Sequence, residues 1–231
     1  MINDFEIGPI RPPSEAFSLL IRVTRNCPWN RCHFCHTYKG AKFQLRPVAK
    51  IKQDILAAKA IQEELKELAV KAGFGDSLRE TIARVLRGAP GATVHNVALW
   101  LYDGGETAFL QDANTLAMKT SDLAEVIRFL KETLPSIKRI TSYGRSQTAA
   151  RKKAEELTES HEAELSRLHI GLESGYDPLL KYMDKGATAA NHIKGGKNIM
   201  AAGISLSEYV ILGLGGKETW HEHALETARV L

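Results

Sequence analysis

All three cysteines of the chain lie within nine residues, at positions 27, 32 and 35. Four residues separate Cys27 from Cys32, and two separate Cys32 from Cys35. Thiolates are soft donors that bind zinc and iron-sulfur clusters. The segment therefore predicts a site for a metal or a cluster, and no cysteine is left for another role.

Three chemistries are open to three neighbouring thiols. A disulfide framework is disfavoured, because the number of cysteines is odd and a chain of 231 residues needs no covalent staple. A zinc ion prefers four ligands, and His33 or His36 could supply the fourth. An iron-sulfur cluster with three protein ligands leaves one iron open to an exogenous ligand, and an open iron allows chemistry.

An apolar strand followed by three closely spaced cysteines, with the aromatic Phe34 directly before the last, resembles the radical S-adenosylmethionine (SAM) superfamily. The resemblance implies that Cys27, Cys32 and Cys35 hold a 4Fe-4S cluster whose open iron binds the amino and carboxylate groups of SAM. It also implies that Phe34 contacts the cofactor. The commonest spacing in the family has three residues between the first two cysteines, and this chain has four.

The elements that position the cysteines alternate between strands and helices. A buried strand over residues 19–23 delivers the cysteines at its carboxyl end, and Pro47 opens a long helix that runs to Gly73. Alternation of this kind predicts an α/β fold with a parallel sheet, either a barrel or an open doubly wound sheet, and the family resemblance implies a partial TIM-like (β/α) barrel. Further strands are expected over 107–111, 140–143, 168–172 and 205–212, and helices over 122–134 and 148–159, from Asp177, and through Ile199 to Gly203.

Residues 73–105 are interpreted as a helical insertion in this alternation. Ser77 and Glu80 form a capping box that opens a short helix, and a second helix is expected over 94–102. We otherwise expect residues 1–231 to form a single radical SAM core domain, since 44% hydrophobic residues suffice for a sizeable core.

Polar residues follow the strand over 107–111, at the end of the sheet where sites lie in such folds. Asp112 accepts hydrogen bonds when ionised, and we expect it to bind the SAM ammonium group with Gln111 and Asn114 beside it. Shaping of the loop is the alternative role of Asp112 and Asn114, because both residue types favour turns.

The sequence Gly104-Gly105-Glu106 is similar to the glycine-rich motif that binds the SAM ammonium group in the family. It lies before the strand over 107–111 and hence at the opposite end of the sheet from the predicted site. We therefore expect these glycines to end a helix and form a turn.

The segment 171–175 resembles the Gly-Ile-Glu-Ser-Gly element of the subgroup that contains coproporphyrinogen dehydrogenase, the Elongator-type catalytic subunit and methylthiotransferases. The resemblance implies that Glu173 and Ser174 contact the ribose or methionine part of SAM. At the end of the preceding strand, Ser142 is a further candidate contact, and Arg145 is expected to pair with the SAM carboxylate. A surface ion pair is the alternative role of Arg145.

The glycine-rich segment 211–218 resembles the adenine-side loop of the family, with Ile211 and Gly213 as its contacts. A tight connection between a strand and a helix is the alternative. Five histidines are interpreted as structural or exposed to solvent, because thiolates suit a cluster better. Of these, His169 is the only candidate for a group that faces the substrate; the five are His33, His36, His169, His221 and His223.

The last predicted helix begins at a capping box formed by Thr219 and Glu222 and reaches Leu231 without a glycine, proline or basic stop signal. We therefore expect the final βα unit to be missing. The strand over 205–212 would then lie at an open edge of the sheet.

The charge pattern gives no indication of nucleic acid, because 31 basic and 27 acidic residues are interspersed along the helices. No apolar run is long enough to span a membrane, and the N-terminus lacks the regions of a signal peptide. We expect a soluble, cytoplasmic protein, whose thiols stay reduced.

The resemblance implies a radical SAM enzyme that cleaves SAM reductively to a 5′-deoxyadenosyl radical, which abstracts hydrogen from a substrate that the sequence does not identify. An electron donor such as flavodoxin or ferredoxin is the expected partner. Two alternatives stay open: a methylthiotransferase-like enzyme that modifies tRNA, and a non-catalytic structural module that binds zinc or an iron-sulfur cluster.

Overall fold

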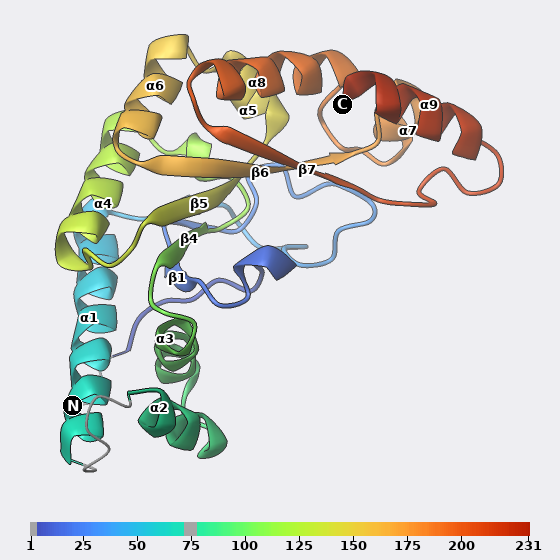
Figure 1. Cartoon of the computed structure of the whole chain (residues 1–231). Helices are drawn as coiled ribbons and strands as arrows, with labels where there is room; N and C mark the ends of the chain where they lie inside the picture. Colours follow the sequence, from blue (N-terminus) through green and yellow to red (C-terminus); the bar gives the residue numbers. More distant parts are fainter. Residues whose placement is uncertain (1–3, 72–77) are drawn as a thin grey trace.

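The computed structural model describes residues 4–71 and 78–231, and its centre is a curved sheet of five parallel strands (Figure 1). The strands pair in the order β1-β4-β5-β6-β7. This arrangement confirms the predicted α/β fold with a parallel sheet. The five strands are β1 (Leu19–Arg22), β4 (Thr107–Gln111), β5 (Arg139–Gly144), β6 (Leu165–Glu173) and β7 (Ser205–Val210).

Helices cover the outer face of the curved sheet, whereas the short 3-10 helix η1 (Pro13–Glu15) lies on its inner face (Figure 1). Successive residues of β4 show why both faces are apolar. Leu110 belongs to the core under the helices, and Phe109 points inward with its ring edge-on to Tyr143 at 5.0 Å. The covering helices are α1 (Val48–Lys71), α4 (Thr120–Thr133), α5 (Ser146–Arg151), α6 (Ala154–Glu162) and α8 (Ala189–Ala201).

The helix expected over 148–159 is wrong, because two helices, α5 and α6, stand in its place. The break falls at Lys152 and Lys153. The Glu156 carboxylate accepts a hydrogen bond from the Lys153 backbone N–H at 2.9 Å and pairs with Lys152 at 2.9 Å, so it starts a new helix at this point.

Two predicted helix starts also differ from the structure. Thr219 precedes α9 (Trp220–Val230), but its hydroxyl donates to the Gly215 carbonyl at 3.0 Å and caps no helical N–H group. Asp177 is the first residue of α7 (Asp177–Tyr182), and its carboxylate accepts from the Ala189 N–H at 2.7 Å. Asp177 therefore binds the first N–H group of α8, whose own cap is Thr188, and does not cap the helix that it begins.

The expected insertion contains α2 (Leu78–Arg87) and α3 (Ala92–Tyr102), and Ser77 of its predicted capping box lies outside the described residues. Helix α3 ends where Gly105 donates its N–H to the Trp100 carbonyl at 3.0 Å. Both Gly104 and Gly105 have positive φ, which confirms their role as a helix terminator. Helix α3 runs beside the outer edge of β1 (Figure 1).

The cysteine-bearing segment leaves the sheet through a short antiparallel ribbon. Strand β2 (Thr24–Arg25) pairs with β3 (Gln44–Leu45) and closes the segment between them. The cysteines thus lie in a closed loop at the carboxyl end of β1.

The opposite edge of the sheet is β7, and within the described ranges only β6 pairs with it. Residues 4–10 form no strand, and Trp220 and Leu225 of α9 are 60% and 47% exposed. The expected position of this strand at an edge of the sheet is thereby confirmed. Across residues 4–71 and 78–231, no helix combines the length and apolar character needed to cross a membrane.

Candidate functional site

A cavity of about 250 Å³ opens at the carboxyl ends of the strands and contains the three cysteines. Its wall includes Gly144 from the end of β5, Glu173 from the end of β6 and Tyr209 from β7. The predicted residues that the structure brings together here are Cys27, Cys32, Phe34, Cys35, Arg145 and Glu173, and the remaining lining residues are Ile10, Tyr38, Ala113, Tyr143, Gly144, Gly171, Lys185 and Tyr209.

The three thiols are free, with Cys32 buried and Cys27 and Cys35 half-buried. Burial raises the pKa of Cys32, and the positive charges of Lys185 and Arg145 oppose that rise. A buried soft donor beside two cations is suited to hold a metal as a thiolate. The donor set therefore fits an iron-sulfur cluster bound by three cysteines.

The zinc alternative has less support. Four ligands about 2.3 Å or less from one ion must converge tightly. Within the described part of the chain, no three His, Cys, Asp or Glu side chains are grouped to hold a single metal ion. Of the two candidate fourth ligands, His33 and His36, both are exposed. Thiols that each bind a different iron need no such convergence.

Glu173 and Lys185 form an ion pair of 2.8 Å in the cavity wall, and each side chain is only 12% exposed. The register of β6 and β7 shifts between Gly171 and Glu173, and Glu173 has a φ of 65°. A residue other than glycine in this region costs about 1–3 kcal/mol and is often found at functional sites. A Cβ at Gly171 would lie 2.1 Å from the Glu173 carboxylate, so glycine leaves room for this side chain in its present position.

Arg145 lies in the cavity wall, and no carboxylate among the described residues pairs with it. Its guanidinium donates to the backbone carbonyls of Lys185 and Gly186 at 2.9 and 3.3 Å. It also lies over the Trp29 ring, 5.4 Å from the centroid. The Arg145 side chain is thus held in place by the loop that carries Lys185.

Asp112 is fully buried and does not line the cavity. Its carboxylate pairs with Arg22 at 2.6 Å, accepts from the Asn26 N–H at 3.1 Å and accepts from the Tyr38 hydroxyl. Burial, together with the Asp112 charge, raises the pKa of Tyr38 well above its usual range, so Tyr38 stays a donor. The expected contact of Asp112 with an ammonium group has no support in this arrangement, because the carboxylate ties the cysteine loop to the sheet.

Gln111, Ser142 and Asn114, which were also predicted as contacts, are not among the described residues that line the cavity. The Gln111 amide binds the backbone of Gly8 and Ile10, and the Ser142 hydroxyl binds Thr115 and the Leu110 carbonyl. These partners belong to the segments that pack around β4 and β5, which no local pattern could show. Asn114 binds Thr148 and the Arg145 N–H at 2.9 and 3.1 Å.

The segment after β6 turns toward α9 instead of the cavity. Ser174 is fully buried and bonds His223 at 2.8 Å, and the second ring nitrogen of His223 meets the Ile211 carbonyl at 3.2 Å. Gly213 has a φ of 78° in the turn that follows. Among the described residues, Ser174, Ile211 and Gly213 do not line the cavity.

His169 faces the inner side of the sheet, as expected, but it is bonded within the protein. Its ring lies 3.2 Å from the Glu15 carboxylate and 3.4 Å from the Tyr209 hydroxyl. Its ring also lies against the rings of Tyr143 and Tyr209, which line the cavity. His223 is buried like His169, whereas His33, His36 and His221 are exposed.

Lys185, Tyr38, Tyr143 and Tyr209 are site residues that the sequence did not reveal. Lys185 lies in an irregular connection between α7 and α8, where no period applies. Tyr209 carried one available signal, since it is a polar aromatic residue on a predicted strand, near the end that faces the site.

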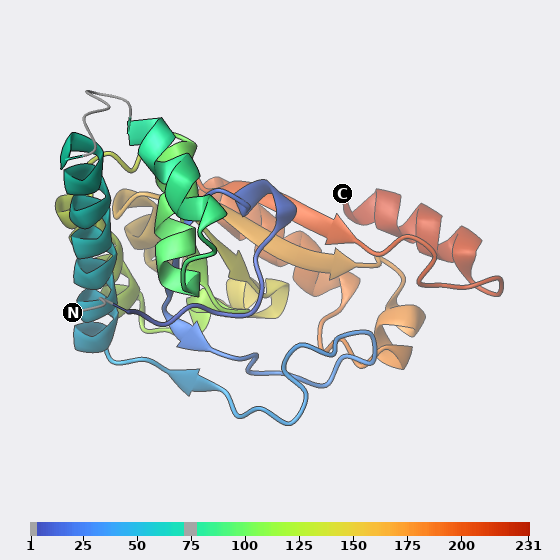
Figure 2. The ribbon, with the colours of Figure 1, turned by 90° about the horizontal axis from the view of Figure 1, so that it is seen from below.

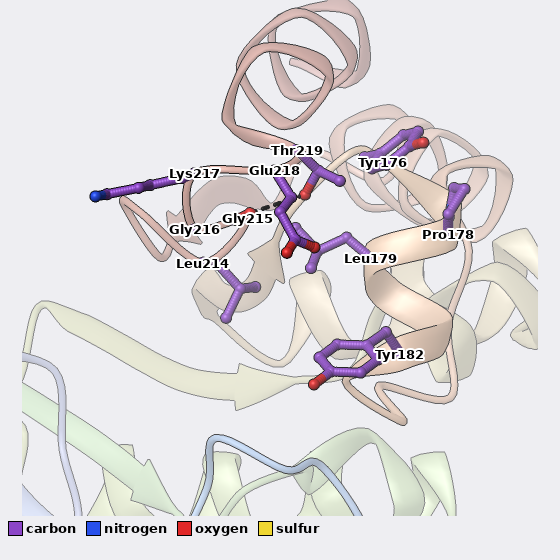
Figure 3. A pocket seen from close by; sticks show the side chains of 10 residues that line it. All are labelled: Tyr176, Pro178, Leu179, Tyr182, Leu214, Gly215, Gly216, Lys217, Glu218 and Thr219. Carbon is purple, nitrogen blue, oxygen red and sulfur yellow. Dashed lines mark hydrogen bonds between the residues drawn. The ribbon is translucent and has the colours of Figure 1, made fainter.

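A larger cavity of about 490 Å³ lies between α7 and the glycine-rich turn before α9 (Figure 3). Leu179 and Tyr182 project from α7 toward Leu214 of this turn (Figure 3). None of the three cysteines lines this cavity. The smaller cavity is therefore the better candidate for the reactive site, despite its size.

The family model of the radical SAM superfamily matches residues 21–228. The chain therefore belongs to the radical SAM superfamily, whose enzymes use a 4Fe-4S cluster and SAM. No curated protein matches the chain in sequence.

Solved structures of radical SAM enzymes share this fold at low sequence identity. The cobalamin-dependent enzyme OxsB has a TM-score of 0.55 at 17% identity, over 92% of this chain and 26% of OxsB. Coproporphyrinogen III oxidase (HemN) from Escherichia coli has a TM-score of 0.54 at 13% identity, over 93% and 42%. Methylornithine synthase (PylB) has 0.52 at 14%, over 92% and 48%. The chain thus spans between about a quarter and a half of each of these structures.

Proposed function

We propose that the protein cleaves SAM reductively to a 5′-deoxyadenosyl radical, which abstracts a hydrogen atom from a substrate. The observation that carries this proposal is that the three cysteines and the Glu173–Lys185 pair line one cavity at the carboxyl ends of parallel strands. That end of the sheet is where such folds place their sites.

Cys27, Cys32 and Cys35 are the proposed ligands of a 4Fe-4S cluster. When bound, the cluster supplies the electron for SAM cleavage. Lys185 and Arg145 favour the ionised form of Cys32 and offset part of the cost of its burial. Tyr38 and Asp112 hold the loop that carries the cysteines against β4.

The polar wall of the cavity is proposed to bind SAM. Glu173 accepts hydrogen bonds from the ribose hydroxyls or the ammonium group, and Lys185 pairs with the methionine carboxylate. Arg145 adds positive charge on the same side, and Phe34 offers an apolar surface beside the Lys185 ammonium, 5.6 Å from its ring centroid. Glu173 and Lys185 neutralise one another in their ion pair.

The inner face of the sheet, with Tyr143 and Tyr209, is the proposed wall of the substrate space. Residues 1–231 are proposed to act as one core domain, with residues 73–105 as its helical insertion. A cytoplasmic location keeps the thiols reduced, and a flavodoxin or ferredoxin supplies the electron.

Cluster binding is tested by anaerobic reconstitution of a variant in which Cys27, Cys32 and Cys35 are all replaced by alanine. We expect iron and sulfide to fall to background, because no other cysteine exists in the chain. The control is Glu106→Gln, at the opposite end of β4, which should retain a full cluster. A full cluster in the triple variant would refute the ligand assignment.

SAM binding is tested by calorimetry on the reconstituted protein. Glu173→Gln and Lys185→Met should each weaken binding about tenfold, equivalent to about 1.4 kcal/mol, through loss of a charge-assisted hydrogen bond. Glu106→Gln again serves as control, since Glu106 pairs with Lys138 on the surface. The assignment of this wall fails if only the Glu106 change reduces affinity.

A further inference from the structure

The additional residue between the first two cysteines belongs to a turn that contains Trp29. The Trp29 indole N–H donates to the Asp184 carbonyl at 2.6 Å. Its ring lies against Gly186, where an added Cβ would come within 2.3 Å of the ring. Gly186 has a φ of 64°, so two independent constraints require glycine at this position.

Three further contacts join the same two segments, the cysteine loop and residues 182–186. The His33 N–H donates to the Met183 carbonyl at 2.9 Å, and the His33 ring meets Tyr182 edge-on at 6.3 Å. Arg31 pairs with the Asp184 carboxylate at 2.9 Å, although its side chain is 64% exposed. Figure 2 shows the loop reaching from β2 toward α7, where the 182–186 segment begins.

The 182–186 segment matters because it carries Lys185 into the cavity. The Lys185 ammonium reaches Glu173 at 2.8 Å, while its carbonyl accepts from Arg145 at 2.9 Å. The guanidinium of Arg145 lies over the Trp29 ring at 5.4 Å and that of Arg31 at 5.0 Å. Trp29 therefore touches both the backbone next to Lys185 and the cation that binds the Lys185 carbonyl.

We propose that Trp29 is a positioning residue, which fixes the 182–186 segment on the cysteine loop and so places the Lys185 ammonium for SAM. This inference rests on the proposed function and extends it to a residue outside the cavity wall. The four-residue spacing between Cys27 and Cys32 supplies the turn from which Trp29 reaches Gly186.

The first test measures SAM affinity by calorimetry, and iron and sulfide content, after anaerobic reconstitution. Trp29→Ala should retain the cluster and weaken SAM binding about tenfold. Trp29→Phe keeps a ring against Gly186 but loses the bond to the Asp184 carbonyl, so we expect about a threefold loss. Trp220→Ala, which removes a tryptophan that is 60% exposed on α9, is the control and should bind SAM like the wild type.

The second test needs neither cluster nor SAM. Hydrogen exchange followed by mass spectrometry should show faster exchange of the peptide over 182–186 in Trp29→Phe and Trp29→Ala, with the β4 peptide unchanged as a check on folding. Unchanged exchange over 182–186, or wild-type SAM affinity in Trp29→Ala, overturns the positioning role. If the wild type itself fails to bind SAM while exchange still responds to Trp29, the proposed function fails and the positioning role stands.

Discussion

The two edges of the sheet differ in how their outward backbone groups are satisfied. At the β1 edge, the Asn96 side chain from α3 accepts from the Leu20 N–H at 3.0 Å and donates to the Ser18 carbonyl at 3.1 Å. At the β7 edge, no element in the part of the chain that the structure describes pairs with the outer side of the strand. One amide side chain thus does at the first edge what a further strand would do.

Two carboxylates, those of Glu15 and Glu208, differ in the same way. Glu15 lies just before β1, fully buried, with Arg139 at 3.0 Å, His169 at 3.2 Å and a hydrogen bond from Ser18. Burial alone would raise the pKa of Glu15, but the bonds from His169 and Ser18 and the charge of Arg139 outweigh it and lower that pKa. The buried charge of Glu15 is therefore compensated by its partners on β5 and β6.

Glu208 of β7 has no comparable compensation. Burial raises the pKa of its carboxyl group. His192 lies 4.0 Å away, but burial, with the nearby charges of Lys185 and Arg145, lowers the pKa of His192 to about 3. His192 is therefore neutral near pH 7, so the pair is not an ion pair. Both residues line a groove of about 320 Å³ beside the open edge.

The largest expected effect is at the covered edge. Asn96→Leu should lower the free energy of unfolding by about 2–4 kcal/mol, because it leaves two buried backbone groups without partners. Urea unfolding measures the loss. Asn198→Leu is a matched control, since the Asn198 amide donates only to the Ala149 carbonyl at 3.2 Å and should cost less. Equal losses of stability in the two variants would show that α3 packs against β1 without stabilising it through the Asn96 hydrogen bonds.

Glu15→Gln should cost about 2 kcal/mol at pH 7, the loss expected when hydrogen bonds to a charged group become neutral. The folded-state pKa of Glu15 lies below the ordinary value of 4.5, so its stabilisation is present above that value and is lost as pH falls through the folded pKa. Thermal unfolding between pH 3 and pH 7 should therefore show a flatter acid limb in the variant. A wild-type slope would contradict the compensation at Glu15.

For Glu208, the pH dependence of stability has the opposite sign to that of Glu15, and the expected change in stability is smaller. Its folded-state pKa lies above 4.5, so the folded state binds the proton more tightly, and this residue's contribution to stability falls as pH rises through that window. Glu208→Gln should be neutral or slightly stabilising at pH 7 and should remove this component from the pH dependence of unfolding. Marked destabilisation at pH 7 would mean that the carboxylate has a partner beyond His192.

The smallest expected difference is between the amide exchange rates of the two edge strands, and it can be measured without a substitution. Amide exchange should be faster over β7, residues 205–210, than over β1, residues 19–22, because the outer groups of β1 are bonded to Asn96. Hydrogen exchange followed by mass spectrometry on the native protein gives both values in one experiment. Equal protection would indicate that the β7 edge is covered in solution.

Local patterns in the sequence were sufficient to predict the sheet and the cysteine site. Strands β1 and β4 are runs of mostly apolar, buried residues, and the three thiols are close together in the chain, so neither prediction needed information from distant residues. Thr219 shows the limit of such patterns. The capping sequence predicts that its hydroxyl binds an N–H group of the following helix. In the structure the hydroxyl instead donates to the Gly215 carbonyl in the preceding turn.

The cofactor contacts depended on pairings between residues far apart in the chain. Asp112 was expected to face a ligand, yet Arg22 and Tyr38, some 90 and 74 positions away, hold it inside the protein. Lys185 was missed for the same reason, since its partner Glu173 is reached only through the fold. The end of a predicted strand shows where polar side chains occur in the sequence. It does not show which residue of the fold each of them binds.

The β2–β3 ribbon has a consequence for the entropy of cofactor uptake. It joins the two ends of the cysteine loop, and inside the loop the Asn26 amide donates to the Lys42 carbonyl at 2.7 Å and the Asn30 amide to the Ala41 carbonyl at 3.1 Å. The entropic cost of closing a loop rises with its length. Here this cost is part of the free energy of folding, because the ribbon forms when the chain folds. The thiols are therefore present at high effective concentration before a cluster arrives, unlike those of zinc fingers, which fold only with metal.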